Sequence, residues 1–401
     1  MKNICSDIQS CTGCTACANV CPKGCIEMRE DSEGFLYPFV DEKACVNCKL
    51  CEKTCPVNNP PKLNDVQKGY IVRNIDKRIV SNSTSGGTSA AFANYAFQQE
   101  GIIFGVGYDN NMVARHFGIN RTEKDRVSEM QGSKYVQSTL GMTFKEVKTV
   151  LDSDTFVVFT GTPCQIAGLK SYLNKEYKNL ITVDLVCHGV SSPLLFKKYV
   201  EYMEDRYGSK VTDVRFRNKT YGYHSSTMMV AFESGKRYYG SGRIDYMAKA
   251  YFSGACSRKC CYQCSFKGDA RCSDLTIFDS WNVGKLNQDC KDDDLGFTNV
   301  FIHTKKGDTF VNELTGALQL WEADPVLMHC LDGVMISKQP SRAAFREELL
   351  RKIAQGQFQE VMQRYLPVTT KDHVVEWGKG MLHRMGIMRI VKQVKNGGDS
   401  K

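Results

Sequence analysis

The sequence lacks any apolar run long enough to cross a membrane. A membrane-spanning helix needs about 18 to 20 consecutive apolar residues, whereas the apolar stretches found here, such as residues 155–159 (TFVVF), have the length of a strand. The first residues (MKNICSDIQSCTGC) also lack the basic region followed by an apolar region that a secretory signal requires. We therefore expect a cytoplasmic protein, in a compartment where disulfides are rare.

The composition excludes a disordered or collagen-like chain. Of the 401 residues, 42% are hydrophobic and 24% are charged, which is typical of globular proteins and sufficient for two or three packed domains. The 53 lysines and arginines exceed the 44 aspartates and glutamates, for a net charge of +9. This excess indicates anionic partners only weakly. Because no segment resembles a nucleic-acid-binding module, we expect no nucleic acid as a partner.

Cysteine is the residue type that is strongly over-represented. The chain has 19 cysteines, and most of those in its first third fall before residue 56. Such a density indicates either disulfides or metal ligands. Because the expected compartment is reducing, we favour metal.

The N-terminal cysteines form a twofold repeat. The pattern CxxCxxCxxxCP occurs at residues 11–22 and again, with identical spacing, at residues 45–56. In two-cluster ferredoxins, three cysteines of each motif bind one 4Fe-4S cluster and the fourth binds the other. The repeat therefore predicts one cluster bound by Cys11, Cys14, Cys17 and Cys55, and a second bound by Cys45, Cys48, Cys51 and Cys21.

A pair of four-cysteine zinc sites is the alternative interpretation of this repeat. Two adjacent and complete quartets with this spacing are far more typical of iron-sulfur clusters, and residues 6–58 resemble bacterial ferredoxins throughout. Cys5 and Cys25 fall outside the pattern, and we interpret them as bystanders. Two clusters make a path for single electrons, so the rest of the chain is expected to hold the other end of that path.

The remaining chain is expected to be an α/β core with a helical extension. Residues 1–60 form the predicted α+β ferredoxin domain, and Asn58–Pro61 is a linker because tandem prolines continue neither helix nor sheet. Apolar strands alternate with amphipathic helices in the two predicted parts of the flavin-binding core, residues 68–150 and 151–336. Residues 337–401 are charged and helical in pattern, with a basic tail.

A small polar loop precedes a predicted helix near residue 88. Backbone N–H groups of residues 82–89 (NSTSGGTS) can close around an anion at a positive helix N-terminus, so a cofactor phosphate fits there. An ordinary Ser/Thr helix cap explains the same residues equally well. A second loop of this kind, with a cation, is Gly132-Ser133-Lys134. The expected cofactor-binding residues are Ser85, Gly86, Gly87, Thr88, Ser89, Gly132, Ser133, Lys134, Gly161 and Thr162.

Two further cysteines lie at the ends of predicted strands. Cys164 follows the strand FVVF and opens a helix behind Pro163, where a helix dipole favours thiolate. Cys187 ends the next strand, and in a parallel sheet both thiols would lie at the same carboxyl-terminal rim. Cys261 and Cys264 can complete four ligands. The competing candidates for that role are Cys256, Cys260 and Cys272, and buried unreactive cysteines are the alternative for Cys164 and Cys187.

Six motifs, in order, resemble one known family. They are SNSTSGG with the following YAFQQEGIIFGVGYD, GSKYVQS, TGTPCQIAGLK, DLVCHGVSSP, VRFRNKTYGY and CYQCSFKGDARCSDLTIFDSW. Together, over residues 68–335, they resemble the family of coenzyme F-420 hydrogenase and dehydrogenase beta subunits, which includes hydroxymethyl-chlorophyll reductase. Phe278–Asn282 departs from the family's usual Gly-Asp-Phe-Trp-Gly-like turn, and Tyr223 replaces a frequent Trp.

The resemblance implies an FAD-binding core with its own 4Fe-4S cluster. Carried over to this chain, it implies that the ligands of this third cluster are Cys164, Cys187, Cys261 and Cys264. It also implies that the flavin loops are residues 85–89 and 132–134. The fused ferredoxin domain would then exchange electrons with this core.

Three groups outside these motifs are candidates for direct roles. Residues 215–224 alternate basic and aromatic side chains, which fits an edge strand with a solvated face; if functional, they suit an anionic substrate or a deazaflavin phosphate. His188 can donate a proton at the flavin or orient a cluster sulfur, although a structural hydrogen bond is the simpler role. Lys134 can pair with flavin charge or substrate.

Together these parts predict an iron-sulfur flavoprotein oxidoreductase. Electrons would pass between three 4Fe-4S clusters and FAD, and on to or from an organic substrate or a reduced deazaflavin coenzyme. A redox protein such as ferredoxin is the expected partner, and a homo-oligomer is compatible with the sequence. The sequence fixes neither the substrate nor the direction of electron flow.

Two other functions compete with this one. The first is a non-catalytic electron-transfer subunit of a larger oxidoreductase complex, and the second is a zinc-stapled interaction protein, which would be colourless. The tail at residues 377–395 mixes apolar residues with Lys and Arg, so peripheral membrane contact and partner docking compete with an amphipathic helix packed on its own domain.

Overall fold

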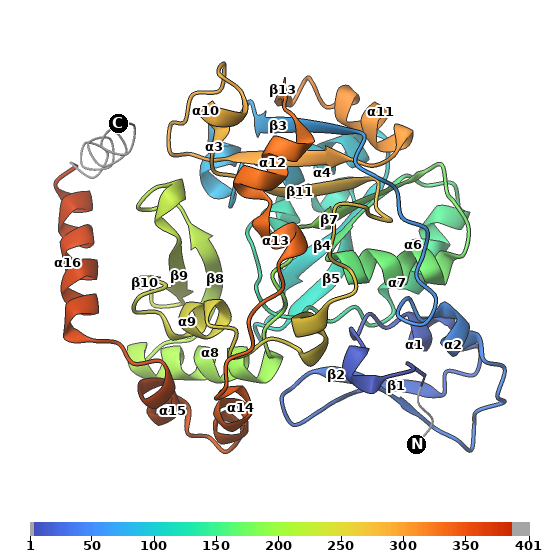
Figure 1. Ribbon diagram of the computed structural model, residues 1–401, viewed down its shortest axis with the longest axis horizontal. Helices are drawn as coiled ribbons and strands as arrows, with labels where there is room; N and C mark the ends of the chain where they lie inside the picture. Colours follow the sequence, from blue (N-terminus) through green and yellow to red (C-terminus); the bar gives the residue numbers. More distant parts are fainter. Residues whose placement is uncertain (1–3, 387–401) are drawn as a thin grey trace.

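A computed structural model describes residues 4–386 of the chain (Figure 1). The N-terminal domain is small and ferredoxin-like. It contains an antiparallel hairpin whose two strands pair from Ile26 opposite Val40 to Glu30 opposite Leu36. The hairpin strands are β1 (Ile26–Glu30) and β2 (Leu36–Val40), and the short helices are η1 (Ile8–Ser10), α1 (Ala16–Val20) and α2 (Leu50–Thr54).

The core is built on one eight-stranded sheet, with strand order β13-β3-β12-β11-β7-β6-β4-β5. Its centre is parallel: β4, β6, β7 and β11 run in the same direction, and antiparallel strands flank them on both sides. The core is therefore mixed α/β. The strands are β3 (Lys68–Asn74), β4 (Ile102–Tyr108), β5 (Ala114–Ile119), β6 (Val157–Gly161), β7 (Leu180–Leu185), β11 (Leu275–Ser280), β12 (Phe297–Ile302) and β13 (Leu318–Glu322).

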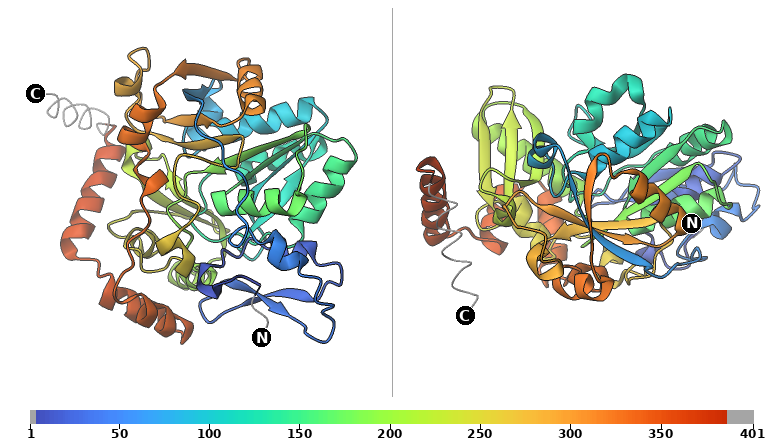
Figure 2. Two further views of the ribbon diagram at one scale, coloured as in Figure 1. Left: turned by 45° about the vertical axis from the view of Figure 1, so that its right-hand side comes forward. Right: turned by 90° about the horizontal axis from the view of Figure 1, so that it is seen from above.

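Helices cover both faces of this sheet. Val157, Val158 and Phe159 of β6 are completely buried, as expected for a central parallel strand whose two faces are both packed. On one face lie α4 (Thr88–Gln98) and α11 (Lys305–Glu313), and on the other lie α6 (Thr143–Asp152) and α7 (Pro163–Leu173). Figure 2 shows this arrangement from two further directions.

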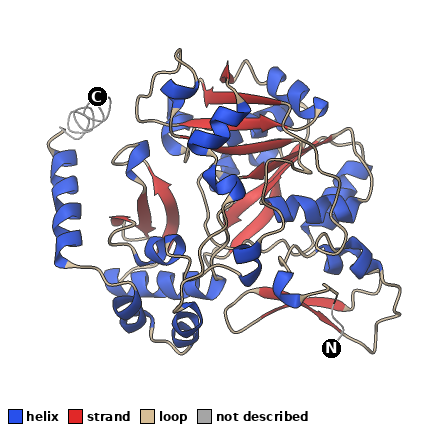
Figure 3. Cartoon of the chain, viewed as in Figure 1, coloured by secondary structure: helices blue, strands red, loops and turns tan. Residues whose placement is uncertain are grey.

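A second, three-stranded antiparallel sheet has the order β10-β9-β8 and its own hydrophobic core. Its strands are β8 (Val211–Asn218), β9 (Thr227–Phe232) and β10 (Arg237–Ser241), and it packs with α8 (Pro193–Tyr207), α9 (Tyr246–Phe252), α14 (Arg346–Ala354) and α15 (Phe358–Tyr365). The other elements, drawn with these in Figure 3, are α3 (Lys77–Asn82), η2 (Arg121–Arg126), α5 (Val127–Met130), η3 (Tyr223–Ser225), η4 (Lys259–Gln263), α10 (Val283–Leu286), α12 (Pro325–Asp332), α13 (Val334–Ser337) and α16 (Thr370–Arg384).

The two predicted core segments, residues 68–150 and 151–336, share the large sheet. Strands β3, β4 and β5 come from the first segment, and the other five come from the second. β8 is an edge strand, as its alternating pattern predicted, but its expected solvated face is wrong at Arg217, whose side chain is only 8% exposed.

Helix α16 packs against the three-stranded sheet (Figure 1). The Ser241 Oγ donates to Glu376 Oε2 at 2.6 Å, and Lys379 Nζ donates to the Ser225 carbonyl at 3.2 Å. Trp377 on the same helix is 68% exposed. The predicted tail continues past Gly386, beyond the described residues, so membrane contact stays a prediction. Between residues 4 and 386, no helix is long and apolar enough to span a membrane.

Candidate iron-sulfur and cofactor sites

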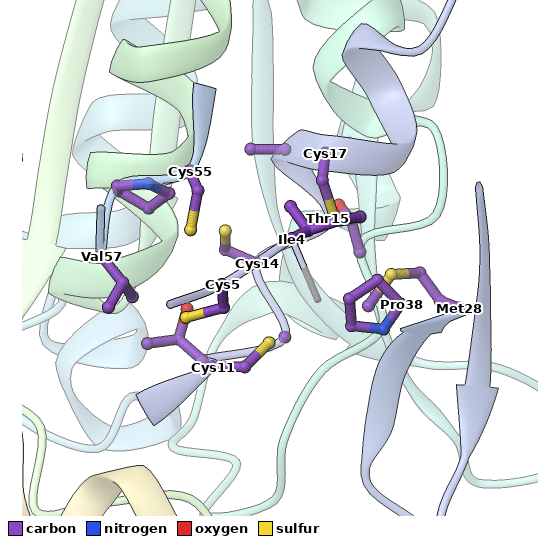
Figure 4. Close-up of a pocket in the computed structure, with 14 residues that line it drawn as sticks. Ile4, Cys5, Cys11, Cys14, Thr15, Cys17, Met28, Pro38, Cys55 and Val57 are labelled. Atoms are coloured by element: carbon purple, nitrogen blue, oxygen red, sulfur yellow. The ribbon is translucent and has the colours of Figure 1, made fainter. Parts of the chain in front are cut away.

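The eight repeat cysteines separate into two groups around two cavities. The first cavity, shown in Figure 4, contains the predicted first set: Cys11, Cys14, Cys17 and Cys55. The second cavity contains the predicted second set: Cys21, Cys45, Cys48 and Cys51. In each cavity the fourth cysteine of one motif joins three cysteines of the other, as the geometry of two-cluster ferredoxins requires. Both donor sets therefore fit a 4Fe-4S cluster.

Backbone turns of the same kind occur in both repeats. Gly13 and Thr15 have φ values of +70° and 62°, and the equivalent residues Asn47 and Lys49 have φ values of 54° and 60°. Left-handed residues between the cysteines turn the chain sharply, so that successive thiols and N–H groups converge on one point. These local turns explain how each short motif surrounds its cavity.

Cys5 and Cys25, the two cysteines outside the repeat pattern, also line these cavities. Cys5 lines the first cavity, and Cys25 lines the second, where its Sγ lies 3.4 Å from the Cys21 Sγ. Burial raises the pKa of Cys5 to about 12 and of Cys25 to about 11. Each predicted cluster therefore has a fifth thiol beside it, which the spacing of the repeat did not indicate.

A third group of thiols converges at the rim of the large sheet. β6 and β7 are adjacent and parallel, so Cys164, in the first turn of α7, and Cys187, just after β7, lie at the same edge, as the sequence predicted. Cys261 belongs to η4, and Cys264 follows it. Burial raises the pKa of Cys164 well above its usual range, and the neighbouring thiols of Cys264, Cys187 and Cys261 raise it further.

The competing cysteines lie in different surroundings. Cys256 and Cys272 are part of hydrophobic cores, where Cys256 is completely buried. Cys260 is adjacent to Cys261 and also faces Tyr37 of the ferredoxin domain. Only Cys260 among these three is therefore close enough to compete directly with a predicted ligand. Within residues 4–386, no three His, Cys, Asp or Glu side chains form a site for a single metal ion.

Helix α7 brings the ferredoxin domain and the rim site together. A Cβ atom on Gly168 would lie only 2.9 Å from both the Cβ and the Sγ of Cys14. Cys164 is four residues earlier on the same helix, a separation of about 6 Å along the axis. The first cavity and the third thiol group are thus separated by about one helical turn.

The two predicted flavin loops lie next to each other. The Ser133 backbone N–H donates to Thr84 Oγ1 at 2.9 Å, which joins residues 132–134 to the loop before α4. Gly87, the N-cap of α4, has a φ of +82°. Gly86 has no space for a side chain, because a Cβ there would lie 2.6 Å from the Val72 carbonyl oxygen.

Side chains from β8 and β11 complete this polar region. Arg217 Nη1 donates to Asp279 Oδ2 at 3.0 Å, and Ser85 Oγ donates to Asp279 Oδ1. Lys219 Nζ donates to the Ser85 carbonyl at 2.6 Å. The second terminal nitrogen of Arg217, Nη2, is buried with no hydrogen-bond partner among the described residues. A buried guanidinium with a free N–H group fits an anionic oxygen such as that of a cofactor phosphate.

Trp281, in the segment that departs from the family pattern, stacks on Tyr223, with ring centroids 4.4 Å apart and an interplanar angle of 21°. The Arg217 guanidinium also lies over the Trp281 ring at 4.4 Å. Sequence reasoning noted Tyr223 and Trp281 only as departures from the family, and it missed their contact. Aromatic residues 58 positions apart carry no spacing signal that predicts stacking.

Lys134 and His188, the predicted catalytic candidates, lie near the sites but apart from each other. Lys134 Nζ donates to the Glu129 carbonyl at 2.6 Å, and burial lowers its pKa to about 7. The His188 ring packs edge-on against Tyr251, with centroids 6.0 Å apart, and its Nδ1 is buried without a partner among the described residues. Tyr251 in turn stacks on Tyr135 at 4.5 Å. These aromatic contacts join the third thiol group to the loop of Lys134.

Family models match two parts of the chain. The model for the C terminus of the coenzyme F420 hydrogenase/dehydrogenase beta subunit matches residues 154–326, and the model of the 4Fe-4S dicluster domain matches residues 10–59. The first match covers the C-terminal portion of the predicted resemblance, and the second coincides with the predicted ferredoxin domain.

Known proteins resemble the chain over different lengths. It is 22% identical over 368 residues to the F subunit of the F(420)H(2) dehydrogenase of Methanosarcina mazei, covering 88% of this chain and 93% of that protein. It is 42% identical over 52 residues to an uncharacterized ferredoxin of Methanocaldococcus jannaschii, covering 13% of this chain and 66% of that protein. A chain of the F420-reducing [NiFe] hydrogenase complex from Methanosarcina barkeri aligns with a TM-score of 0.42 and 18% identity, over 76% of this chain and 92% of that one.

The cysteine repeat, the dicluster match and the core match agree along the chain. The dicluster domain accounts for 4Fe-4S clusters at the N-terminus, and the core is related to subunits of oxidoreductases. The chain therefore belongs to the family of coenzyme F420 hydrogenase/dehydrogenase beta subunits, with a 4Fe-4S dicluster domain at its N-terminus, and is an iron-sulfur electron-transfer protein.

Proposed function

We propose that this chain passes electrons between its ferredoxin-type clusters and FAD, through a third 4Fe-4S cluster, and on to or from an organic substrate or a reduced deazaflavin coenzyme. The observation that carries the proposal is the contact of Gly168 with Cys14, four residues after Cys164 on α7. Electrons move between protein-bound centres only over short distances. One turn of helix between two cysteine groups is such a distance.

The residues around the third thiol group would hold the cluster in a dry and fixed environment. The Gly189 backbone N–H donates to the Cys187 Sγ at 3.3 Å, and the Thr162 Oγ1 lies 3.3 Å from the Cys164 Sγ. Hydrogen bonds to the sulfur ligands raise the reduction potential of a cluster. Lys267 Nζ donates to the Cys187 carbonyl at 2.5 Å and places a positive charge beside the same site.

The flavin loops and Arg217 would bind the FAD. The region around Ser85, Ser133 and Arg217 offers backbone N–H groups, hydroxyls and a buried guanidinium, which suit a cofactor phosphate. FAD supplies the exchange between one-electron and two-electron chemistry. The stacked rings of Tyr135 and Tyr251 exclude water from the path between this region and Cys187.

Metal and flavin content test the proposal directly. Three clusters predict about 12 iron and about 12 acid-labile sulfide per chain, with one FAD released on denaturation. The protein is to be purified anaerobically and its iron, sulfide, zinc and flavin measured. Stoichiometric zinc without sulfide would contradict the proposal and support the zinc-stapled alternative.

The third cluster has a sharper test in Cys261→Ser. If Cys164, Cys187, Cys261 and Cys264 bind one cluster, this variant is expected to lose about four of the 12 iron atoms while the ferredoxin-type clusters remain. Flavin reduction by a protein electron donor is then expected to slow greatly. Cys256→Ala is the control, because Cys256 lies in a hydrophobic core and is expected to keep all the iron. Iron loss in Cys260→Ser but not in Cys261→Ser would show that the ligand assignment is wrong.

A non-catalytic electron-transfer subunit is the second candidate. It is supported by the similarity over 93% of the length of a protein that is itself named as a dehydrogenase subunit. We infer that this chain also joins a larger oxidoreductase complex. The purified chain is to be supplied with reduced deazaflavin coenzyme and an artificial electron acceptor: turnover by the chain alone supports the enzyme, and turnover only with added partner subunits supports the second candidate.

A further inference from the structure

Arg258 is a fully buried arginine between the ferredoxin domain and the core, with none of its surface exposed. Its Nε donates to the Cys11 carbonyl at 2.8 Å, and its Nη2 donates to the Leu36 carbonyl at 3.0 Å. Its Nη1 donates to Gln137 Oε1 at 2.9 Å, and the guanidinium carbon lies 4.0 Å from the centre of the Tyr37 ring. All of these partners are neutral.

A buried positive charge with only neutral partners is strongly destabilising unless an opposite charge lies nearby. The other fully buried arginine of this interface, Arg346, has such a charge: its two terminal nitrogens donate to the Glu33 carboxylate at 2.8 and 2.6 Å. In the described part of the chain, Arg258 has no ion pair with a carboxylate. Its ionisable neighbours are Cys11, Tyr37, Cys260 and Cys261.

Two of these neighbours are predicted cluster ligands on opposite sides of the arginine. Cys11 belongs to the first cavity, and Cys261 belongs to the third thiol group. A 4Fe-4S cluster with its four thiolates carries a net negative charge. We propose that Arg258 is the counter-ion shared by these two clusters, and that it also fixes the distance between them.

This role has a consequence for the reduction potentials. Reducing a cluster adds one negative charge to it, and a cation in a poorly solvated interface stabilises that charge strongly. Arg258 should therefore raise the potentials of the two inner clusters. The second cavity, whose Cys48 is exposed to solvent, does not include Arg258 or its partners among its lining residues, so its cluster should be almost unaffected. Electrons would then accumulate on the inner clusters. The part concerning the third cluster rests on the proposed function.

Arg258→Met removes the charge and keeps much of the volume. The midpoint potentials of the clusters are to be measured by redox titration with electron paramagnetic resonance, on the full chain with its clusters. We expect the one-electron reduction of the two inner clusters to become about tenfold less favourable, which corresponds to about 59 mV. The outer cluster, unchanged, is the internal reference.

Two variants separate charge from packing. Arg258→Lys keeps the charge, so its potentials are expected to stay close to those of the natural chain. Arg346→Met combined with Glu33→Gln removes an equally buried ion pair from the same interface but no neighbour of a predicted ligand, so it is expected to leave all three potentials unchanged.

Unchanged inner potentials in an iron-replete Arg258→Met protein would overturn the proposal, as would an equal shift in the Arg346→Met/Glu33→Gln protein. If Arg258→Met assembles no clusters, Arg258→Lys decides: natural potentials support the proposal, and lowered inner potentials overturn it. The titration needs neither FAD nor substrate. A protein with only about eight iron atoms would contradict the third cluster, while the inner ferredoxin-type cluster would still decide the role of Arg258.

Discussion

At the scale of single residues, burial alone does not distinguish ligand cysteines from core cysteines. Burial raises the pKa of Cys187 to about 11 and of Cys256 to about 12, although only the first is a predicted ligand. A metal ligand must be a thiolate, so a buried cysteine becomes a ligand only where a metal compensates its charge. The feature that separates the two residues is the presence of other thiols: Cys187 has Cys261 beside it, and Cys256 lies among apolar side chains.

His116 connects the buried face of the sheet to the start of α7. Its Nδ1 is 3.1 Å from Ser138 Oγ, which accepts a hydrogen bond from Gln165 Nε2 at 2.9 Å. The ring stacks on Phe159, with centroids 5.5 Å apart. His116 therefore supports the turn that carries Cys164, and its protonation would place a charge where none can be solvated.

This burial predicts a pH dependence of stability. Burial lowers the pKa of His116 from 6.5 to about 4. Between these values the unfolded chain binds a proton that the folded chain does not, so the stability present above pH 6.5 is lost as the pH falls. We expect a loss of about 1 kcal/mol between pH 7 and 5.5, measured by thermal unfolding. His116→Gln should lose less over this range. An identical pH dependence in both proteins would contradict the prediction.

At the scale of elements, α7 combines two tasks that normally conflict. Its first turn carries Cys164, and Gly168 gives Cys14 of the ferredoxin domain space to approach the helix. Glycine inside a helix costs about 1 kcal/mol relative to alanine. The close approach explains why a poor helix former occupies the middle of this helix.

Gly168→Ala tests the close approach. A methyl group 2.9 Å from the Cβ and Sγ of Cys14 must displace the ferredoxin domain or the helix. Overpacking of this kind costs about 1 to 3 kcal/mol, which exceeds the helix-propensity gain of about 1 kcal/mol. We expect a net loss of stability of up to about 2 kcal/mol in thermal unfolding, together with slower flavin reduction by a protein donor.

Gly378→Ala is the matched control for that substitution. Gly378 also lies inside a helix, α16, but no atom is within 4 Å of the position of its missing Cβ. The same change should therefore be neutral or stabilising there, by up to about 1 kcal/mol. If Gly168→Ala were as well tolerated as Gly378→Ala, the ferredoxin domain would not be held as closely as the structure indicates.

Short-range patterns made the local elements predictable. The strand-loop-helix pattern around Cys164 follows from Pro163 and the preceding apolar run, and the parallel pairing of β6 and β7 placed Cys187 at the same rim. The antiparallel strands that flank the parallel centre did not follow from the sequence, because pairing between β3 and β12 joins segments more than 200 residues apart. For the same reason the ion pair of Arg217 with Asp279 was missed, and this strand was expected to be solvated.

At the scale of the whole molecule, the ferredoxin domain is part of the protein's buried interior. Cys14 and Ala16 belong to the same hydrophobic core as α6 and α7. The Asn19 side chain donates to the Gly141 carbonyl at 2.9 Å, and Arg346 and Glu33 join the C-terminal extension to the hairpin β1-β2. The sequence identified this domain as a unit through its repeat and linker. It could not show the docking, because the residues that make it are 120 to more than 300 positions apart and follow no periodic pattern.

The docking predicts that the linker is dispensable for holding the two parts together. Asn59, Pro60 and Lys62 are exposed, so a specific protease site inserted there is accessible. After cleavage, the two fragments are expected to elute together from a gel-filtration column, because separating them would expose apolar core and leave Arg258 and Arg346 without their partners. The inner clusters should keep their spectroscopic signature, since their surroundings are unchanged. Fragments that separate at physiological ionic strength would show that the covalent linker, and not the buried interface, keeps the first cavity beside α7.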